Sequence, residues 1–146
     1  MADNKKNKAT EVKKVEFVID ASGAVLGRIA SYAAKQALLG KNVVIVNCDS
    51  IKLTGRTRMV VGEYNTARRR GGTSLNGPHF PKYTERIVKR TIRGMLSYTQ
   101  QRGLDALKRV MCYSDVPAEY ASVKKVSMVR ESKAKTITLK ELSKEI

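Results

Sequence analysis

Hydrophobic residues in the first third of the chain follow strand spacing, then helical spacing, then strand spacing again. Val15–Asp20 is rich in β-branched and aromatic residues, as is typical of a strand. From Val25 to Leu39 apolar residues recur every three to four positions, and Gly40 is a natural C-terminal stop. Val43–Asn47 is apolar at successive positions, which indicates a strand covered on both faces. This part of the chain predicts a βαβ unit.

The middle of the chain predicts a short strand, two helices and a long loop between the helices. Ile51–Leu53 is the strand, and a helix from about Thr54-Gly55 to Arg69 follows it. The loop Arg70–Tyr83 contains glycine, proline and aromatic residues, and its length favours a functional loop. The next helix covers Thr84 to Leu96. The inner side of the first helix is predicted to consist of Met59, Val60, Tyr64 and Ala67.

The helix Thr84–Leu96 has a basic side and an apolar side. At about 100° per residue, four cations fall on roughly one third of its circumference. These four are Arg86, Lys89, Arg90 and Arg93. The apolar side is predicted to consist of Ile87, Val88, Thr91, Ile92, Met95 and Leu96. One side can therefore be buried while the other holds four positive charges in fixed positions.

The last third predicts a helix around Gly103–Arg109 and then Val110–Tyr113 as the last strand of the main sheet. Residues 118–136 have no clear period, although Val123–Val129 could pair at a sheet edge. Thr138–Ile146 predicts a closing helix, because Thr138 and Glu141 have the spacing of a capping box.

These elements predict an α/β fold with a mostly parallel four-stranded sheet. We expect residues 15–146 to form a single domain, large enough to bury a core. Residues 1–14 are polar and lysine-rich, and we interpret them as a mobile basic arm.

Charge narrows the possible partners. The chain has 29 basic and 13 acidic residues, which gives a formal charge of +16. The window Arg56–Arg109 holds ten of the twelve arginines, and arginine adds bidentate phosphate contacts and stacking on bases. Nucleic acid is the expected partner, and an anionic membrane surface is the weaker alternative. No helix-turn-helix, zinc finger or dimerising heptad is present, so folded RNA is favoured over a DNA operator.

The residues favour RNA contacts from the basic helix, from neighbouring arginines and from the loop before the helix. The arginines are Arg58, Arg68 and Arg69. In the loop, we expect Arg70, His79, Phe80 and Tyr83 to insert between RNA strands and stack on unpaired bases.

Catalytic and cofactor sites are not predicted. Gly23 and Gly27 lie between a strand and a helix, but their spacing and the following Arg28 do not match a Walker loop. The single histidine, His79, rules out a multi-histidine metal site, so no metal and no cofactor are expected. Cys48 and Cys112 make no disulfide framework and are interpreted as small buried hydrophobes. Without a secretory signal or a long apolar run, we expect a soluble intracellular protein.

Four blocks resemble a known family: VIDASGAVLGRIAS (18–31), VNCDSIKLTG (46–55), RTIRGML (90–96) and RGLDALKRVMCY (102–113). Together they resemble the universal large-subunit ribosomal protein thirteen family, in its archaeal type, over about residues 15–120. The family usually has proline where this chain has Ser97, so the helix before it could run a turn further.

The resemblance implies a three-layer α/β/α domain that binds large-subunit ribosomal RNA, acts early in subunit assembly on the cytoplasmic ribosome and contacts neighbouring large-subunit proteins. It implies no enzymatic activity. The positions that match the family and carry RNA roles implied by the resemblance are Arg28, Thr54-Gly55-Arg56, Gly71-Gly72, Arg90, Arg93-Gly94 and Arg102-Gly103. Lys82, Lys108 and Arg109 complete the expected RNA-binding set. The alternatives are an RNA-acting or nucleotide-dependent enzyme on the same core and a free regulatory RNA-binding protein.

Overall fold

A computed structural model describes residues 17–70, 80–129 and 134–146. The arm predicted at residues 1–14 therefore lies outside the described residues. The chain begins with the predicted βαβ unit, in which β1 (Phe17–Asp20) and β2 (Val43–Val46) are joined by α1 (Leu26–Leu38). The two strands pair in parallel, with Ile19 opposite Ile45. All four residues of β2 are buried, as the run of apolar residues predicts.

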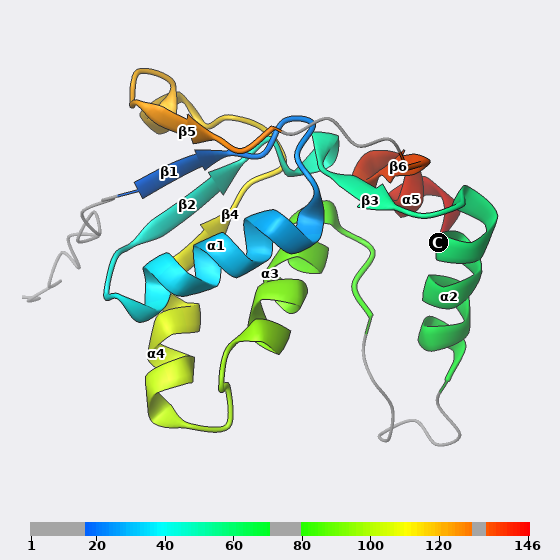
Figure 1. The fold of residues 1–146 in the computed structure, drawn as a ribbon, viewed down its shortest axis with the longest axis horizontal. Coiled ribbons are helices and arrows are strands. Elements are labelled where there is room, and N and C mark those ends of the chain that lie inside the picture. The colour runs from blue at the N-terminus through cyan, green and yellow to red at the C-terminus, as the bar shows by residue number, and fades with distance from the viewer. Residues whose placement is uncertain (1–16, 71–79, 130–133) are drawn as a thin grey trace, which may run out of the picture.

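The remaining elements follow as short segments along the chain (Figure 1). In the middle of the chain these are the 3-10 helix η1 (Cys48–Ser50), β3 (Lys52–Thr54), α2 (Thr57–Arg69) and α3 (Thr84–Met95). The last third contains α4 (Gln101–Lys108), β4 (Val110–Cys112), η2 (Ala118–Tyr120), β5 (Lys125–Ser127), β6 (Thr136–Thr138) and α5 (Leu139–Glu145).

Among the described residues the main sheet has four strands in the order β4-β2-β1-β5. Each neighbouring pair in it is parallel. The predicted α/β fold with a mostly parallel four-stranded sheet is therefore confirmed, and so is the pairing of Val123–Val129 at an edge. The strand predicted at Val110–Tyr113 is confirmed in this sheet as β4, but the prediction that it is the last strand is wrong. The later strand β5 joins the opposite edge, where it pairs with β1. A strand of three residues is too short for its sequence pattern to indicate this partner.

The two faces of the sheet are covered differently. Helices α1, α3 and α4 lie on one side (Figure 1), where Ile19, Val43 and Ile45 belong to the main core with Ile29 and Ile92. On the other face Val18, Val44 and Val46 pack against three residues of the segment that contains η2: Tyr113, Val116 and Tyr120. The outer layer on that face is therefore a short irregular segment with one 3-10 turn.

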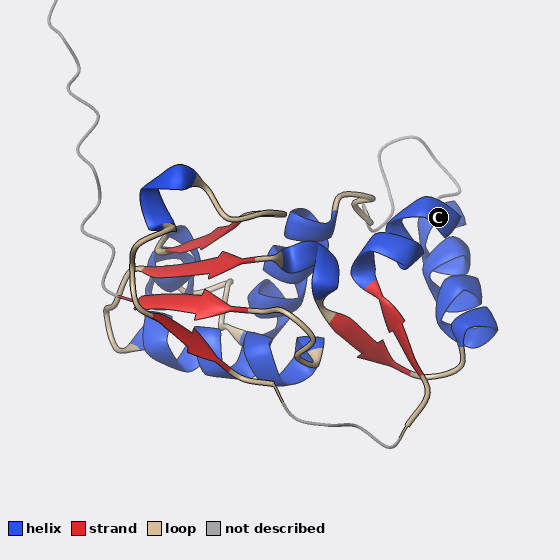
Figure 2. Cartoon of the chain, turned by 90° about the horizontal axis from the view of Figure 1, so that it is seen from above, coloured by secondary structure: helices blue, strands red, loops and turns tan. Residues whose placement is uncertain are grey.

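A second, smaller sheet lies beside the main one (Figure 2). In it β3 pairs with β6 in antiparallel fashion, and α5 continues directly from β6. Thr138 and Glu141 form the predicted capping box at the start of α5. The Leu139 amide donates to the Ile51 carbonyl at 2.8 Å, which joins this unit to the chain leaving β2.

Two predictions about helix sides are wrong. Met59 was placed on the inner side of α2, but its side chain is 63% exposed, and α2 buries none of its residues. Met95 was placed on the apolar side of α3, yet it is 43% exposed at the end of that helix. In both cases the helical spacing is correct but the side chain remains exposed. The helix α3 ends at Met95 and does not run a turn further, because Leu96 has an extended backbone.

Candidate nucleic-acid interface

The basic side of α3 forms the centre of the candidate site. Ile87, Val88 and Ile92 are buried, whereas Arg86 and Arg93 are exposed. The predicted separation of a basic and an apolar side is therefore confirmed for these residues. Lys89 and Arg90 are partly covered, and all four cations line one open hollow.

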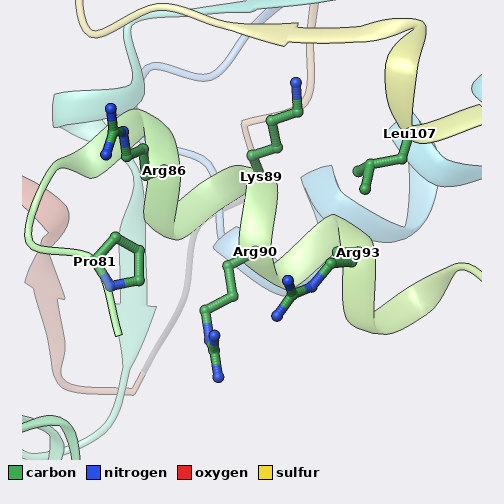
Figure 3. Close-up of a pocket in the computed structure, with 6 residues that line it drawn as sticks. All are labelled: Pro81, Arg86, Lys89, Arg90, Arg93 and Leu107. Atoms are coloured by element: carbon green, nitrogen blue, oxygen red, sulfur yellow. The ribbon is translucent and has the colours of Figure 1, made fainter. Parts of the chain in front are cut away.

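This hollow has a volume of about 320 Å³. Figure 3 shows the four cationic side chains radiating from α3, with Pro81 on one side of them and Leu107 of α4 on the other. A trough that combines apolar walls with several fixed cations suits a phosphate backbone and its attached bases.

The start of α3 is fixed by a buried polar contact. The Thr84 hydroxyl donates to Asp49 Oδ1 at 2.6 Å, and Thr84 is only 6% exposed. Its oxygen also lies 3.2 Å from Ser114 Oγ. Asp49 follows β2 and Ser114 follows β4, so the carboxyl ends of two adjacent strands hold the first residue of the basic helix. The position of the cations along α3 is thereby set by the sheet.

Aromatic rings lie against three of the four cations. The Arg90 guanidinium carbon is 3.9 Å from the centroid of the Phe80 ring. The corresponding distances are 5.6 Å from Arg86 to Tyr83 and 5.5 Å from Arg93 to Tyr98. Such contacts restrict long arginine side chains while leaving their charge in place.

Tyr98 was not among the predicted site residues. The signal that could have identified it was an aromatic residue directly after a basic helix, where the chain turns back.

Other predicted RNA-binding residues lie away from α3. Arg56, Arg58, Arg69 and Arg70 are exposed on α2 or at its ends. Arg68 is exposed as well, but its Nη1 donates to the backbone oxygen of Ile146 at 2.6 Å.

Arg28 lies on α1, in a separate hollow beside β5. Arg102 is exposed on α4, and Lys82 is exposed ahead of α3.

Two predicted residues have structural contacts of their own. Lys108 Nζ lies 3.5 Å from Asp105 Oδ1 on the exposed surface of α4. Arg109 donates from Nη1 to the Ala37 carbonyl at 3.3 Å and so joins α4 to α1. Gly71, Gly72 and His79 lie outside the described residues.

The residues considered for other chemistry are engaged in structural contacts. The Gly23 amide donates to the Ser50 carbonyl, and its φ of +68° suits the turn before α1. Cys48 is buried, as predicted, and the neighbouring Cys112 thiol together with burial raises the pKa of the Cys48 thiol. Within the described ranges no group of three or more histidine, cysteine or acidic residues could hold a metal ion. The helices of this part of the chain are also too short or too polar to cross a membrane.

Comparison with known proteins identifies a matching family and several archaeal relatives. A sequence model described as ribosomal protein L13 matches residues 14–119. The archaeal relatives include proteins named large ribosomal subunit protein uL13. The protein from Methanosarcina barkeri is 42% identical over 135 residues, which cover 88% of this chain and 96% of the relative. The protein from Methanococcoides burtonii is 40% identical over 134 residues, with the same coverage of both chains.

A third relative, from Archaeoglobus fulgidus, is 40% identical over 133 residues, which cover 87% of this chain and 85% of the relative. The resemblance based on four sequence blocks, including its archaeal character, is thus confirmed. With a matched region that extends from the start of β1 to η2, this chain belongs to the ribosomal protein L13 family.

Proposed function

We propose that this protein is a structural constituent of the large ribosomal subunit and that it binds large-subunit ribosomal RNA through the basic side of α3. The observation that carries the proposal is the row of cations Arg86, Lys89, Arg90 and Arg93, held on a helix whose first residue is fixed to the sheet. Fixed cations bind phosphate with little loss of side-chain freedom. The named function of the archaeal relatives supports the same proposal.

In this proposal the protein has a scaffolding role rather than an enzymatic one. It joins the subunit early in assembly, contacts neighbouring large-subunit proteins and resides on cytoplasmic ribosomes. The separate hollow beside β5, which Arg28 and Lys35 line, extends the RNA-binding or protein-binding surface away from α3.

The experiment replaces Arg86, Lys89, Arg90 and Arg93 with glutamate and measures binding of the full chain to large-subunit ribosomal RNA. The four charge reversals should abolish binding, because each substitution removes an attraction and adds a repulsion, and wild-type affinity should fall by orders of magnitude over a few-fold increase in salt if six or more phosphates are contacted. A control with the same charge change carries glutamate at Lys52, Lys124, Lys135 and Lys144, which are exposed away from α3 and do not line the hollow beside β5. We expect this control to weaken binding far less.

Equal losses in the two variants would show that total charge, rather than the α3 surface, determines binding. Sedimentation provides the second measurement. The wild-type protein should remain with the large subunit at low salt and at high salt, in a one-to-one ratio. Loss of the protein from the subunit at low salt would contradict a structural role.

A further inference from the structure

Phe80 lies between two side chains from different helices. Arg90 of α3 is stacked on its ring at 3.9 Å, measured from the guanidinium carbon to the ring centroid. Tyr64 of α2 meets the same ring nearly edge-on, with centroids 6.1 Å apart and an angle of 80° between the planes. The three side chains therefore form a continuous set of contacts from α2 to α3. Helix α2 has no fully buried residue, although Val60, Val61 and Tyr64 pack partly buried against the core.

The contact between Phe80 and Arg90 is closer than the other cation–ring contacts on the basic side of α3. Arg86 and Arg93 lie 5.6 and 5.5 Å from their rings, so their guanidinium groups are less closely held. Fixing a free arginine side chain on binding costs conformational entropy, and a side chain that is already ordered avoids much of that cost. Arg90 is therefore the cation of this surface whose position is most strongly set before RNA arrives.

The environment of Tyr64 agrees with a supporting role for its ring. Tyr64 is partly buried and packs against the core, and this burial raises the pKa of its hydroxyl. One face of the Phe80 ring is occupied by Arg90 and another part by Tyr64. A base could stack on Phe80 only where these two side chains leave the ring free.

We propose that Phe80 is a positioning residue for Arg90, and that Tyr64 in turn holds the Phe80 ring. This inference deepens the proposed function and rests on it, since it concerns how the α3 surface binds ribosomal RNA. It differs from the sequence-based expectation, in which Phe80 itself stacks on an unpaired base. In the present assignment Phe80 contributes to affinity through Arg90.

A double-mutant cycle separates these two roles. Binding of the full chain to large-subunit ribosomal RNA is measured for the wild type, Phe80→Leu, Arg90→Gln and the double variant. A cation–ring contact of this kind predicts that Phe80→Leu weakens binding about fivefold. In the Arg90→Gln background the same substitution should change binding by less than about twofold, because the group that Phe80 positions is gone.

Equal effects of Phe80→Leu in both backgrounds would overturn the proposal, since they would show that Phe80 contacts RNA directly. Unchanged binding by Phe80→Leu or by Arg90→Gln would overturn it as well. Neither result would decide the proposed function, which the four glutamate substitutions on α3 test separately.

Two further variants protect the experiment against a folding defect. Phe80→Trp keeps an aromatic face and should retain wild-type affinity, and a loss of affinity in a folded Phe80→Trp protein would contradict the assignment. If Phe80→Leu fails to fold, Tyr64→Ala takes its place in the cycle. Met59→Ala is the matched control on α2, because Met59 is exposed, and it should not alter binding.

Discussion

At the scale of single residues, the turns after β1 and β2 are held together by Asp20. The Asn47 side-chain amide donates to Asp20 Oδ1 at 2.9 Å, and the Ser22 amide and hydroxyl donate to the same oxygen at 3.0 and 2.8 Å. Partial burial raises the pKa of the Asp20 carboxyl, but these hydrogen bonds outweigh burial and hold the pKa below its ordinary value of 3.8. Asn47 also has a left-handed backbone, with φ at +60°.

Substitutions at Asn47 should separate the hydrogen bond from the backbone conformation. Asn47→Gly removes the hydrogen bond but accommodates the positive φ, and it should lower the free energy of unfolding by about 1–2 kcal/mol. Asn47→Ala should cost about 1 kcal/mol more, because alanine does not favour a positive φ. Urea denaturation at neutral pH measures both values, and equal losses would contradict a role for the backbone.

The hydrogen bond between Asn47 and Asp20 also predicts how the free energy of unfolding depends on pH. Because the folded-state pKa of Asp20 is depressed, its ionised form stabilises the protein above pH 3.8, and this stability is lost as the pH falls through the lower folded-state value. Asn47→Gly removes one cause of the depression. Its stability should therefore decline less steeply than that of the wild type in acid, as followed by urea denaturation at a series of pH values.

Residues of the candidate site could be predicted where the sequence pattern that indicates them spans only a few neighbouring positions. The four cations of α3 and the capping box of α5 follow from spacing alone, and the structure places them as expected. Met59 and Met95 were misplaced because periodicity gives a direction on a helix but not a neighbour in that direction. The contact of Tyr64 with Phe80 joins α2 to the segment just before α3, and the two residues are too far apart in the sequence for any local pattern to contain it.

At the scale of elements, the turn from α3 to α4 leaves no room for a side chain at Gly103. A Cβ added there would collide with the backbone carbonyl of Ser97. The Gly103 amide donates to the Gln100 carbonyl at 3.0 Å, so the glycine lies where the chain folds back on itself. Gly62, in the middle of α2, has no atom within 4 Å of the same added group.

We expect Gly103→Ala and Gly62→Ala to have opposite effects on stability. Overpacking at Gly103 should lower the free energy of unfolding by about 1–3 kcal/mol. Gly62→Ala should leave it unchanged or raise it by up to about 1 kcal/mol, because alanine favours the helix. Thermal and urea unfolding of the two variants provide the measurement. A neutral Gly103→Ala variant would show that the turn can relax away from the added methyl group.

Elements with strong local periodicity were predicted within one to three residues of their observed bounds, and pairings between distant short strands were not. The strand predicted at Val43–Asn47 was correctly expected inside the sheet because its first four residues, Val43–Val46, are all apolar. The pairing of Lys52–Thr54 with Thr136–Thr138 has no counterpart in the sequence pattern, since both strands are short and mostly polar. Such strands form because adjacent elements bring them together.

At the scale of the whole molecule, the formal charge of +16 means that the affinity for any polyanion falls as salt is added. The slope of affinity against salt concentration shows how many phosphates a given surface neutralises. Arg86→Gln combined with Arg93→Gln should reduce that slope by about 2, or about 1 for each phosphate contact. Lys124→Gln combined with Lys144→Gln, on exposed positions of other elements, is the control. Equal reductions in both pairs would contradict a localised interface.

The absence of any buried residue in α2 also determines how that helix behaves over time. A helix of about this length is marginally stable on its own in water, and α2 packs against the core only through partly buried side chains, those of Val60, Val61 and Tyr64. Its backbone amides should therefore exchange with solvent through local opening, many times faster than those of the fully buried strand β2. Equally slow amide exchange of α2 and β2 in the free protein would contradict this expectation. Addition of ribosomal RNA should slow amide exchange in α2 far more than in β2. This result would mean that the arginine-rich helix gains much of its final order from its partner, while the sheet already holds its structure before binding.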